Sequence, residues 1–452
     1  MEKLRKSLLD SPYARWGILL LLGIILSVNY YVYDAFSSLK SLLTSELGFT
    51  NTQYGLFVSF YAIPNTFLLM AVLGGMILDK LGIRRTGFLF VFFMAFGAVL
   101  TAYGASDYYR EGGIAYQMMN SIFPKYSPEL KMMLAGRFFY GLGAETSIVV
   151  VSKILVKWFK GKDLALAFGL KVGFGRLGTF LALRISPALA REGTQLSTAI
   201  WFAAILACIG LLAFVIYMLI DLKVDKERAS SGSKVKTDKF VLKDILGIIN
   251  NRAYIYILLI CVCFYSAVFP FMAFAPDFFM NKYGITNLES GRLTSLLPLG
   301  TMLFTPLFGF LVDRKGRSAS AMILGASILL MVHLVFALTS LQPQAFLILL
   351  GVAFSLVPAA MWPTMVKLVK EKEIGTAYGL MYSVQNLGLW GVPILAGVIL
   401  DKSNPGNPGT LNYTPTLLMF AALSMIALLV AISLKWADSR KNFGVELPLN
   451  KK

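Results

Sequence analysis

Long apolar runs recur along the whole chain, separated by short segments of polar and charged residues. Most runs hold about 20 predominantly apolar residues, the number that an α-helix needs to cross the ~30 Å hydrocarbon core of a bilayer. The pattern therefore predicts an all-α membrane protein with twelve transmembrane helices. The predicted spans are residues 15–39, 53–78, 86–105, 129–157, 163–190, 198–221, 252–280, 288–312, 319–341, 344–368, 375–400 and 413–436.

A long polar segment, residues 223–251, separates the sixth and seventh predicted spans. It opens with a stretch rich in Ser, Gly and Lys, which is typical of a flexible linker. An amphipathic stretch follows, which is typical of a helix on a membrane surface. We therefore expect an N-terminal six-helix bundle (1–222), a cytoplasmic linker with an amphipathic helix (223–251) and a C-terminal six-helix bundle (252–452).

A loop of glycines and charges follows the second predicted span and recurs after the eighth. The first copy contains Asp79 and Arg84, and the second contains Asp313 and Arg317. One copy would be weak evidence, because any cytoplasmic turn tends to be basic with an acid nearby. Two copies in register predict parallel repeats about an axis normal to the membrane. A carboxylate at a helix end beside cations can hold adjacent helices together, so we expect a gating or structural role for these four residues.

Composition narrows the possible functions. Hydrophobic residues make up 57% of the chain and charged residues 15%, with a mean hydropathy of +0.69, which excludes a soluble fold. The net charge of +18 does not indicate nucleic-acid binding, because most lysines and arginines fall on the side of the membrane that carries both termini. That asymmetry predicts cytoplasmic N and C termini. The sequence has no recognisable nucleotide loop, metal-ligand cluster or nucleophile triad, so we expect no enzyme activity, cofactor or metal.

Two charged residues interrupt the fourth and fifth predicted spans. Glu145 lies 13 residues before Trp158, and Arg176 lies the same number after the basic turn that follows, about 20 Å at ~1.5 Å per residue. Both therefore lie near the bilayer centre, where a charge costs roughly 2.5–3.5 kcal/mol. They must face a polar cavity, where an acid and a base can capture the two ends of a zwitterionic peptide, or form a structural ion pair with each other.

The repeated loops resemble the best-known signature of the major facilitator superfamily of secondary transporters, and RFFYGLG (137–143) resembles its second motif. This resemblance implies two six-helix bundles that rock around a central site.

A closer resemblance, to the lysosomal dipeptide carrier family of that superfamily, covers most of the chain. It is carried by Tyr33-Asp34, Pro64-Asn65, GRFFYGLGAE (136–145), WFKGKDLALAFGL (158–170), Arg176-Leu-Gly178, VFPFMAF (268–274), GFLVDRKG (309–316), MWP (361–363), GTAYGLMYSVQNLGL (375–389) and AGVILD (396–401). The resemblance implies that Glu145 binds the amino terminus and Arg176 the carboxylate of a dipeptide, and that transport is uniport. The family pattern does not include Lys153, Lys171 and Arg184, which leaves the substrate specificity open.

Further candidates for substrate binding lie in the C-terminal half. Trp362 lies between two prolines that weaken the tenth span, and broken helices often border transporter sites. Tyr382, Gln385 and Asn386 form one polar stripe at i, i+3 and i+4, which either lines the cavity or makes interhelical hydrogen bonds.

Tyr265 and Phe269 flank a proline in the seventh span, and they either line the cavity or serve only in helix packing. The remaining substrate-binding candidates are Tyr33 and Asn65, which lie in the stretches that carry the resemblance.

Other polar residues in the N-terminal half have open roles. Arg137 shares a helix face with Glu145 and either orients it or pairs with a backbone carbonyl of the first span. Asp34 is a possible proton site, as is Glu145, but we favour a gate or a solvated helix-end residue. The fifth span carries glycines at which we expect close helix packing, namely Gly169, Gly173 and Gly178.

We expect alternating-access transport of small peptides, dipeptides foremost. The alternatives are a proton-coupled peptide symporter, an organic-anion carrier of the same fold and, less favoured, a non-transporting membrane sensor. The expected partners are a small peptide and the lipid bilayer, with a monomeric protein that needs no accessory subunit. Because most outer loops are short and no sorting signal is evident, a bacterial-type plasma (inner) membrane is favoured over a lysosome.

Overall fold

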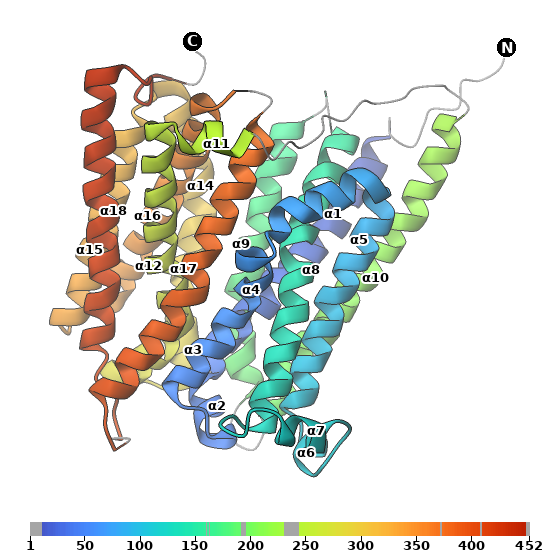
Figure 1. Cartoon of the computed structure of the whole chain (residues 1–452), viewed down its shortest axis with the longest axis vertical. Helices are drawn as coiled ribbons and strands as arrows, with labels where there is room; N and C mark the ends of the chain where they lie inside the picture. The colour runs from blue at the N-terminus through green and yellow to red at the C-terminus, as the bar shows by residue number, and fades with distance from the viewer. Residues whose placement is uncertain are drawn as a thin grey trace.

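The predicted spans form two helical bundles that stand side by side in a computed structural model (Figure 1). The structure describes residues 11–159, 161, 163–190, 196–229, 244–370, 373–406 and 409–448, and within these ranges the regular structure is entirely helical. The first helix begins and the last helix ends at the same end of the molecule, which we call the terminal end; the other is the closed end.

The N-terminal bundle runs from blue to green in Figure 1. Its elements are α1 (Pro12–Asp34), η2 (Ala35–Leu39), α2 (Lys40–Leu47), α3 (Asn51–Ser59), η3 (Phe60–Ala62), α4 (Ile63–Phe67), α5 (Met70–Gly104), α6 (Asp107–Arg110), α7 (Tyr116–Ser121), α8 (Pro128–Phe159), α9 (Leu164–Leu189) and α10 (Leu196–Ala229).

The C-terminal bundle runs from yellow to red, after a short helix at the terminal end. Its elements are α11 (Asp244–Ile249), α12 (Arg252–Tyr283), α13 (Asn287–Thr294), α14 (Leu296–Lys315), α15 (Ser318–Leu338), α16 (Pro343–Leu368), α17 (Ile374–Ser403) and α18 (Thr414–Lys441). The predicted amphipathic helix contributes α11, whereas residues 230–243 of the predicted linker lie outside the described residues.

The all-helical membrane fold is confirmed, with one correction to the second predicted span. Eleven helices in the described ranges are long and apolar enough to cross a membrane. Residues 53–78 are instead divided among α3, η3, α4 and the start of α5. Pro64 cannot donate a backbone hydrogen bond, and Leu69 adopts a left-handed conformation (φ 51°), so a single helix does not form. The turn to the third predicted span lies at Gly82 (φ 78°, ψ 172°), inside α5.

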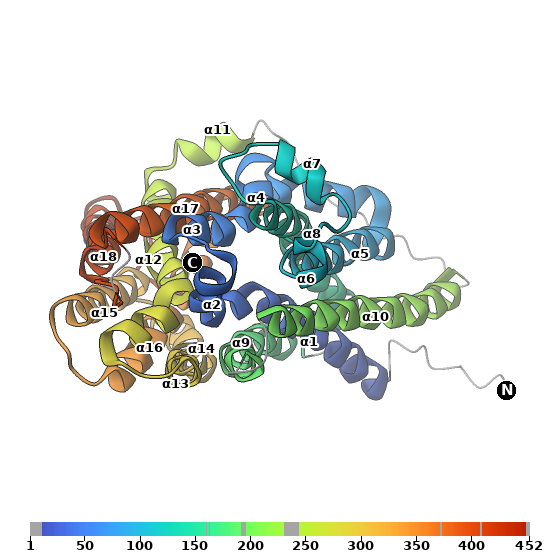
Figure 2. The same ribbon diagram turned by 90° about the horizontal axis from the view of Figure 1, so that it is seen from below.

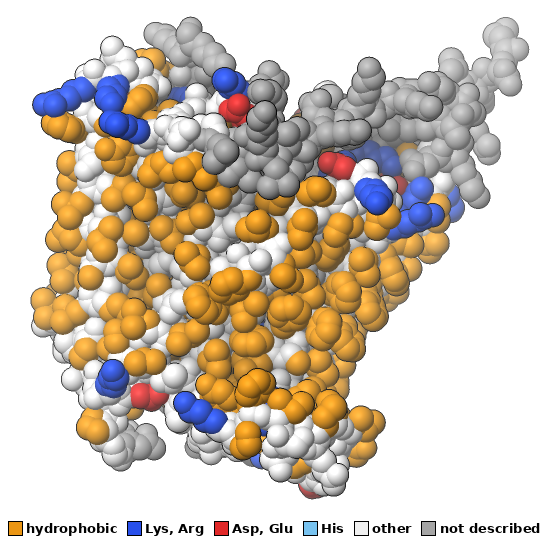
Figure 3. All heavy atoms as spheres, viewed as in Figure 1, with side chains coloured by type: hydrophobic (Ala, Val, Ile, Leu, Met, Phe, Trp, Pro, Cys, Tyr) orange, Lys and Arg blue, Asp and Glu red, His pale blue; other side chains and the backbone are white. Residues whose placement is uncertain are grey.

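The outer surface carries a broad apolar band, with lysines and arginines gathered toward the ends (Figure 3). Large apolar side chains that face outward include Leu212, 58% exposed, and Leu303, 62% exposed. A soluble protein rarely exposes such a continuous patch, so the band fits contact with lipid tails.

The repeated loops differ in their contacts. In the first copy Asp79 forms an ion pair with Lys153 (2.5 Å), and Arg84 lies 3.6 Å from Asp221. In the second copy Asp313 is exposed and forms no salt bridge with the residues described.

The backbone of the second copy is held by the chain after α18. The N–H of Arg317 donates a hydrogen bond to the carbonyl oxygen of Glu446 at 2.8 Å. A gating role for the four loop residues stays a prediction.

Candidate substrate site

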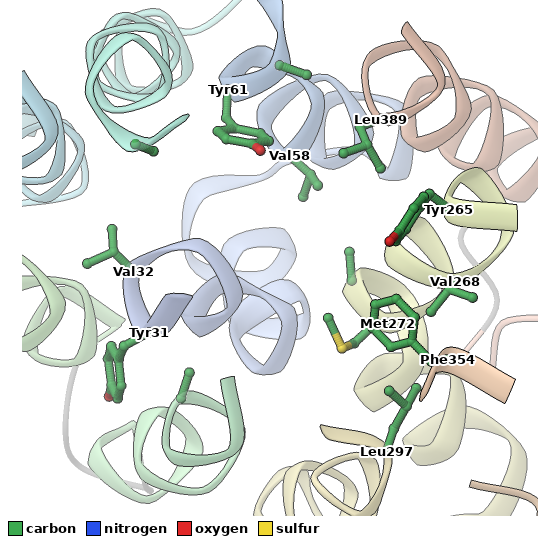
Figure 4. Packing of buried hydrophobic residues seen from close by; sticks show 14 of the residues in the cluster. Tyr31, Val32, Val58, Tyr61, Tyr265, Val268, Met272, Leu297, Phe354 and Leu389 are labelled. Atoms are coloured by element: carbon green, nitrogen blue, oxygen red, sulfur yellow. The ribbon is translucent and has the colours of Figure 1, made fainter. Parts of the chain in front are cut away.

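A cavity of about 600 Å³, counting the part open to solvent, lies between the two bundles. Figure 4 shows Tyr61 of the N-terminal half and Leu389 and Tyr265 of the C-terminal half pointing toward the space between them. The polar lining residues are Asn29, Tyr30, Tyr33, Tyr61, Tyr140, Glu145, Tyr382 and Gln385.

Glu145 is the acidic residue of this lining, and it comes from the middle of α8. The hydroxyl of Tyr61 donates a hydrogen bond to its carboxylate. Glu145 takes part in no salt bridge across the described ranges. The carboxylate therefore faces the cavity without a salt-bridge partner, although Lys171 attracts it from a greater distance.

Arg176 of α9 reaches toward the C-terminal half and is surrounded by aromatic rings. Its guanidinium carbon lies 4.4 Å from the ring centroid of Phe354 and 5.8 and 6.0 Å from those of Tyr30 and Phe269. Among the described residues it has neither a salt bridge nor a hydrogen-bond partner. The structural ion pair between Glu145 and Arg176 is therefore not formed. Glu145 lines the cavity, whereas Arg176 lies outside the lining and against two of its rings, those of Tyr30 and Phe269.

The C-terminal half supplies an aromatic wall. Trp362 donates its indole N–H to the hydroxyl of Tyr265 (3.1 Å) and packs against Tyr382 with ring centroids 4.9 Å apart. Tyr265 stacks on Phe269, whose ring edge meets Phe354. The expected break in the tenth span is absent, because α16 runs through both of its inner prolines as one helix.

Sequence reasoning missed several cavity residues. Tyr30, Tyr61 and Tyr140 line the cavity, and Phe354 contacts Arg176. A signal was present for Phe354, since it precedes Trp362 by eight residues and so lies near the same face of α16.

Three predicted amide side chains lie in different environments. Gln385 lines the cavity. Asn386 is buried and donates from its side-chain nitrogen to the backbone oxygen of Tyr382 at 2.9 Å, outside the cavity lining. Asn65 is fully buried, and neither polar atom of its side chain has a partner in the described part of the chain. Whether these three residues contact substrate stays a prediction.

Arg137 is buried in a cage of aromatic rings, with 1% of its surface exposed. Its guanidinium carbon lies 5.2–5.8 Å from five ring centroids, those of Tyr33, Phe36, Phe57, Tyr61 and Tyr140. Both expected contacts of Arg137, with Glu145 and with a backbone carbonyl of the first span, are absent among the described residues. Cation–π attraction offsets part of the cost of burying this charge.

Asp34 is buried, 2% exposed, and accepts a hydrogen bond from the hydroxyl of Thr179 at 2.6 Å. The expectation of a solvated helix end is therefore wrong, because η2 continues the chain directly and α9 covers the carboxylate. Its role as a proton site stays a prediction.

An ion pair seals the end of the cavity that lies away from the termini. Lys40 and Asp277 approach to 2.6 Å and are both buried, and Tyr413 also donates a hydrogen bond to Asp277. Tyr54 adds a hydrogen bond to the backbone oxygen of Ala273 at 2.8 Å. These contacts join the N-terminal and C-terminal halves, so the two bundles are closed together at this end.

A second contact between the halves holds α3 against α17. Asp401 accepts hydrogen bonds from the backbone N–H groups of Asn51 and Thr52 at 3.1 and 2.8 Å. The side chains of both residues donate to the same carboxylate, at 2.8 and 2.6 Å. Because Asn51 begins α3, the carboxylate caps the helix from the opposite half of the molecule.

The glycines of the fifth span differ in how closely a neighbouring helix approaches them. A Cβ at Gly178 would lie 2.1 Å from the backbone oxygen of Ser27, which confirms close packing there. At Gly169 and Gly173 a Cβ would have no neighbour within 4 Å, so the expected packing is not present at these two positions.

Comparison with known proteins gives one matching family. The model of the Major Facilitator Superfamily matches residues 20–391 and 262–442. Among curated proteins, the lysosomal dipeptide transporter MFSD1 of Danio rerio is 30% identical over 433 residues, covering 93% of this chain and 86% of that protein. The lysosomal dipeptide transporter MFSD1 of Homo sapiens is 30% identical over 399 residues, covering 85% of this chain and 80% of that protein. The sialic acid transporter NanX of Escherichia coli (strain K12) is 24% identical over 387 residues, covering 82% and 84%.

Solved structures share the fold at low sequence identity. The D-xylose–proton symporter has a TM-score of 0.70 and 14% identity, covering 93% of this chain and 97% of its own. A bacterial homologue of the human lysosomal transporter Spinster has a TM-score of 0.68 and 15% identity, covering 96% and 99%. The two-bundle architecture is therefore that of known transporters.

Proposed function

Because the chain belongs to the Major Facilitator Superfamily, we propose that it transports dipeptides across a membrane by alternating access, as a uniporter. The observation that carries this proposal is a pair of opposite charges, one in the lining of the central cavity and one against two of the rings that line it. Glu145 and Arg176 come from adjacent helices, and neither is neutralised by the other.

A dipeptide has an ammonium and a carboxylate that match these two charges. Glu145 binds the ammonium, with Tyr61 fixing the carboxylate. Arg176 offers a planar fork of donors to the peptide carboxylate, and the rings around it exclude water. The aromatic wall formed by Trp362 and Tyr382 accommodates side chains of different shape.

Counterflow in proteoliposomes loaded with Ala-Ala tests the proposal. We expect exchange of labelled Ala-Ala, lost by at least about tenfold in Arg176→Ala and in Glu145→Gln, since each removes a charge-assisted hydrogen bond. Arg440→Ala and Glu111→Gln remove the same charges from exposed positions and should leave exchange unchanged. Unchanged exchange in either cavity variant would refute the assigned site.

Proton coupling is the alternative to uniport, and Asp34 is its candidate residue. The buried Asp34 carboxylate lies at the end of α1, a helix that lines the cavity, and accepts a hydrogen bond from Thr179 of α9. In the uniport proposal the two charges of the peptide meet Glu145 and Arg176, while Asp34 keeps its hydrogen bond to Thr179 and takes no part. Exchange of Ala-Ala should therefore be independent of an imposed pH gradient, and exchange that appears only with a gradient would favour the symporter.

An organic-anion carrier is a second candidate, favoured by the cations near the cavity. Arg176 and Lys171 form no salt bridge with a carboxylate in the described part of the chain. NanX, a similar protein, is named for sialic acid, a carboxylate. Competition separates the two functions, because the dipeptide proposal expects Ala-Ala and not succinate to compete with labelled Ala-Ala.

We further propose that the termini are cytoplasmic and that the protein works as a monomer in a bacterial-type plasma membrane without an accessory subunit. The excess of lysine and arginine on the terminal side supports the orientation. A cysteine at Ser439, exposed near the end of α18, should react with an impermeant maleimide only in inside-out vesicles. Reaction in right-side-out vesicles would reverse the orientation.

A further inference from the structure

Lys171 is a cation of α9 that the proposed binding of a dipeptide does not use. Its ammonium donates a hydrogen bond to the hydroxyl of Ser152 at 2.6 Å and lies 5.6 Å from the ring centroid of Phe168. An ammonium has three donors. It forms no salt bridge with the described residues, and the one carboxylate that attracts it, that of Glu145, lies beyond salt-bridge distance.

The contact with Ser152 places this ammonium on the cavity side of α8. Glu145 and Ile148 both line the cavity. Ser152 follows them by seven and four residues and therefore lies on the same face of the helix. Lys171 thus lies about 10 Å from Glu145 along α8, at ~1.5 Å per residue, in the direction of the terminal end.

Arg176 and Lys171 form two successive levels along α9. They are five residues apart, about 7.5 Å along the helix axis, with Lys171 nearer the terminal end. A peptide carboxylate held by Arg176 leaves the adjacent side chain of the same residue near the level of Lys171. A second carboxylate on that side chain would meet the unpaired ammonium.

We propose that Lys171 determines substrate specificity by binding the side-chain carboxylate of dipeptides that end in glutamate or aspartate. The inference rests on the proposed function, because it assumes that Arg176 holds the main-chain carboxylate of a dipeptide. Lys153 of α8 is also a lysine inside a predicted span, but it forms a salt bridge with Asp79 at 2.5 Å. Lys171 reaches only a neutral hydroxyl, and a charge in a membrane span ordinarily meets an opposite charge.

The purely structural reading of Lys171 is a tie between α8 and α9. That reading makes Lys171→Met and Ser152→Ala equivalent, because each removes the same hydrogen bond. The specificity reading separates them, because only Lys171→Met removes the charge.

The experiment is counterflow with three peptides of similar shape, Ala-Glu, Ala-Gln and Ala-Lys. For the wild-type protein, we expect the half-saturating concentration of Ala-Glu to be on the order of tenfold lower than that of Ala-Gln. One additional charge-assisted hydrogen bond accounts for a difference of this size. Lys171→Met should bring this ratio to about one, and Lys171→Glu should make Ala-Lys the preferred peptide. Ser152→Ala and Lys153→Met are the matched controls and should keep the preference for Ala-Glu.

The outcomes separate the two proposals. Exchange of Ala-Gln with no preference for Ala-Glu, or a preference that survives in Lys171→Met, overturns the role of Lys171 and leaves dipeptide transport standing. Loss of the preference in Ser152→Ala as well as in Lys171→Met also overturns it, in favour of the structural tie. Exchange of none of the three peptides and none of Ala-Ala overturns the proposed function itself.

Discussion

Two pairs of helices cross at the closed end, and the internal repeat relates them. α3 crosses α17, and α13 crosses α9 (Figure 2). A Cβ at Gly55 would lie 2.2 Å from the backbone oxygen of Pro393, and one at Gly291 would lie 2.3 Å from that of Leu183. Gly291 follows Gly55 by 236 residues and Pro393 follows Leu183 by 210, so the same backbone contact is made twice. The close approach is therefore a property of the repeat.

The side chains around the two crossings differ. On the α17 side Asp401 accepts four hydrogen bonds from Asn51 and Thr52. On the α9 side the side chain of Arg184 donates one, from Nε to the hydroxyl of Ser295 at 3.1 Å. Bonds to an ionised carboxylate are stronger than bonds between neutral groups, and four of them share one acceptor. The repeat thus supplies the shape of both crossings, while side-chain bonding is concentrated on α17.

The same pair of helices differs again at the cavity. AFGL (167–170) of α9 aligns with AYGL (377–380) of α17, and RLG (176–178) aligns with NLG (386–388) at the same offset. Arg176 lies among aromatic rings without a hydrogen-bond or salt-bridge partner in the described ranges, whereas its equivalent Asn386 bonds to its own helix. In the proposed function, the cation that binds the substrate thus belongs to one repeat only.

The largest expected effect comes from making the repeats alike at this position. Arg176→Asn should lower Ala-Ala counterflow roughly 10- to 100-fold, because a hydrogen bond to a charged group contributes about 1.5–3 kcal/mol. Asn386→Ala should change it by less than about threefold, since Asn386 is neutral and its side chain bonds to its own helix. Initial rates in proteoliposomes with matched protein content decide the matter, and equal losses would place both residues at the substrate.

The next effect concerns the glycines that follow these two residues. A Cβ at Gly178 meets the backbone oxygen of Ser27 at 2.1 Å, and a Cβ at Gly388 meets the side-chain oxygen of Ser266 at 1.8 Å. Ser266 can rotate, because its hydroxyl has no hydrogen-bond partner in the described chain, whereas a backbone oxygen moves only with its helix. Overpacking costs about 1–3 kcal/mol. Gly178→Ala should therefore lower the midpoint of thermal unfolding in detergent more than Gly388→Ala, and the reverse order would contradict this account.

A smaller effect tests the two crossings at the closed end. Asp401→Ala removes the cap of α3, so the amide hydrogens of Asn51 and Thr52 should exchange with solvent at least about tenfold faster. A hydrogen bond to a charged group contributes about 1.5–3 kcal/mol, which corresponds to a change of at least this size. Arg184→Met removes one bond and should leave exchange near Ser295 within about threefold of wild type. Hydrogen-exchange mass spectrometry on both variants compares the crossings directly. Equal acceleration at the two crossings would mean that the four bonds of Asp401 do not strengthen the α17 side.

Sequence alone predicted the features that depend on local composition. Apolar runs and the cost of charge in a bilayer are local properties, so the membrane fold and the place of Glu145 and Arg176 well inside long helices could be derived from them. The repeated loops predicted two related halves for a similar reason, because each copy can be recognised on its own.

The features that sequence reasoning missed depend on distant contacts or on backbone conformation. Lys40 and Asp277 are 237 residues apart, and nothing near either residue names the other as its partner. The left-handed conformation of Leu69, which ends the helix within the second span, is one that leucine rarely adopts, so the residue type gives no signal. Asp34 was placed at the correct helix, but its burial follows from Thr179 on another helix.

The smallest expected change in stability concerns the terminal end, where the two repeats differ once more. A Cβ at Gly379 would meet Val72 at 2.5 Å, whereas the space beside its equivalent Gly169 is open. Alanine is favoured over glycine within a helix by roughly 0.5–1 kcal/mol, so Gly169→Ala should slightly raise the unfolding midpoint and Gly379→Ala should not. At the terminal end α17 already contacts the N-terminal half through Val72, whereas α9 makes no such contact at Gly169. If transport closes this end by bringing α9 against the C-terminal half, the added methyl group at position 169 must fit into the new contact. We therefore expect Gly169→Ala to be more stable and yet exchange Ala-Ala about two- to threefold more slowly. A stabilised variant with wild-type exchange would mean that α9 stays apart from the C-terminal half at this level throughout the cycle.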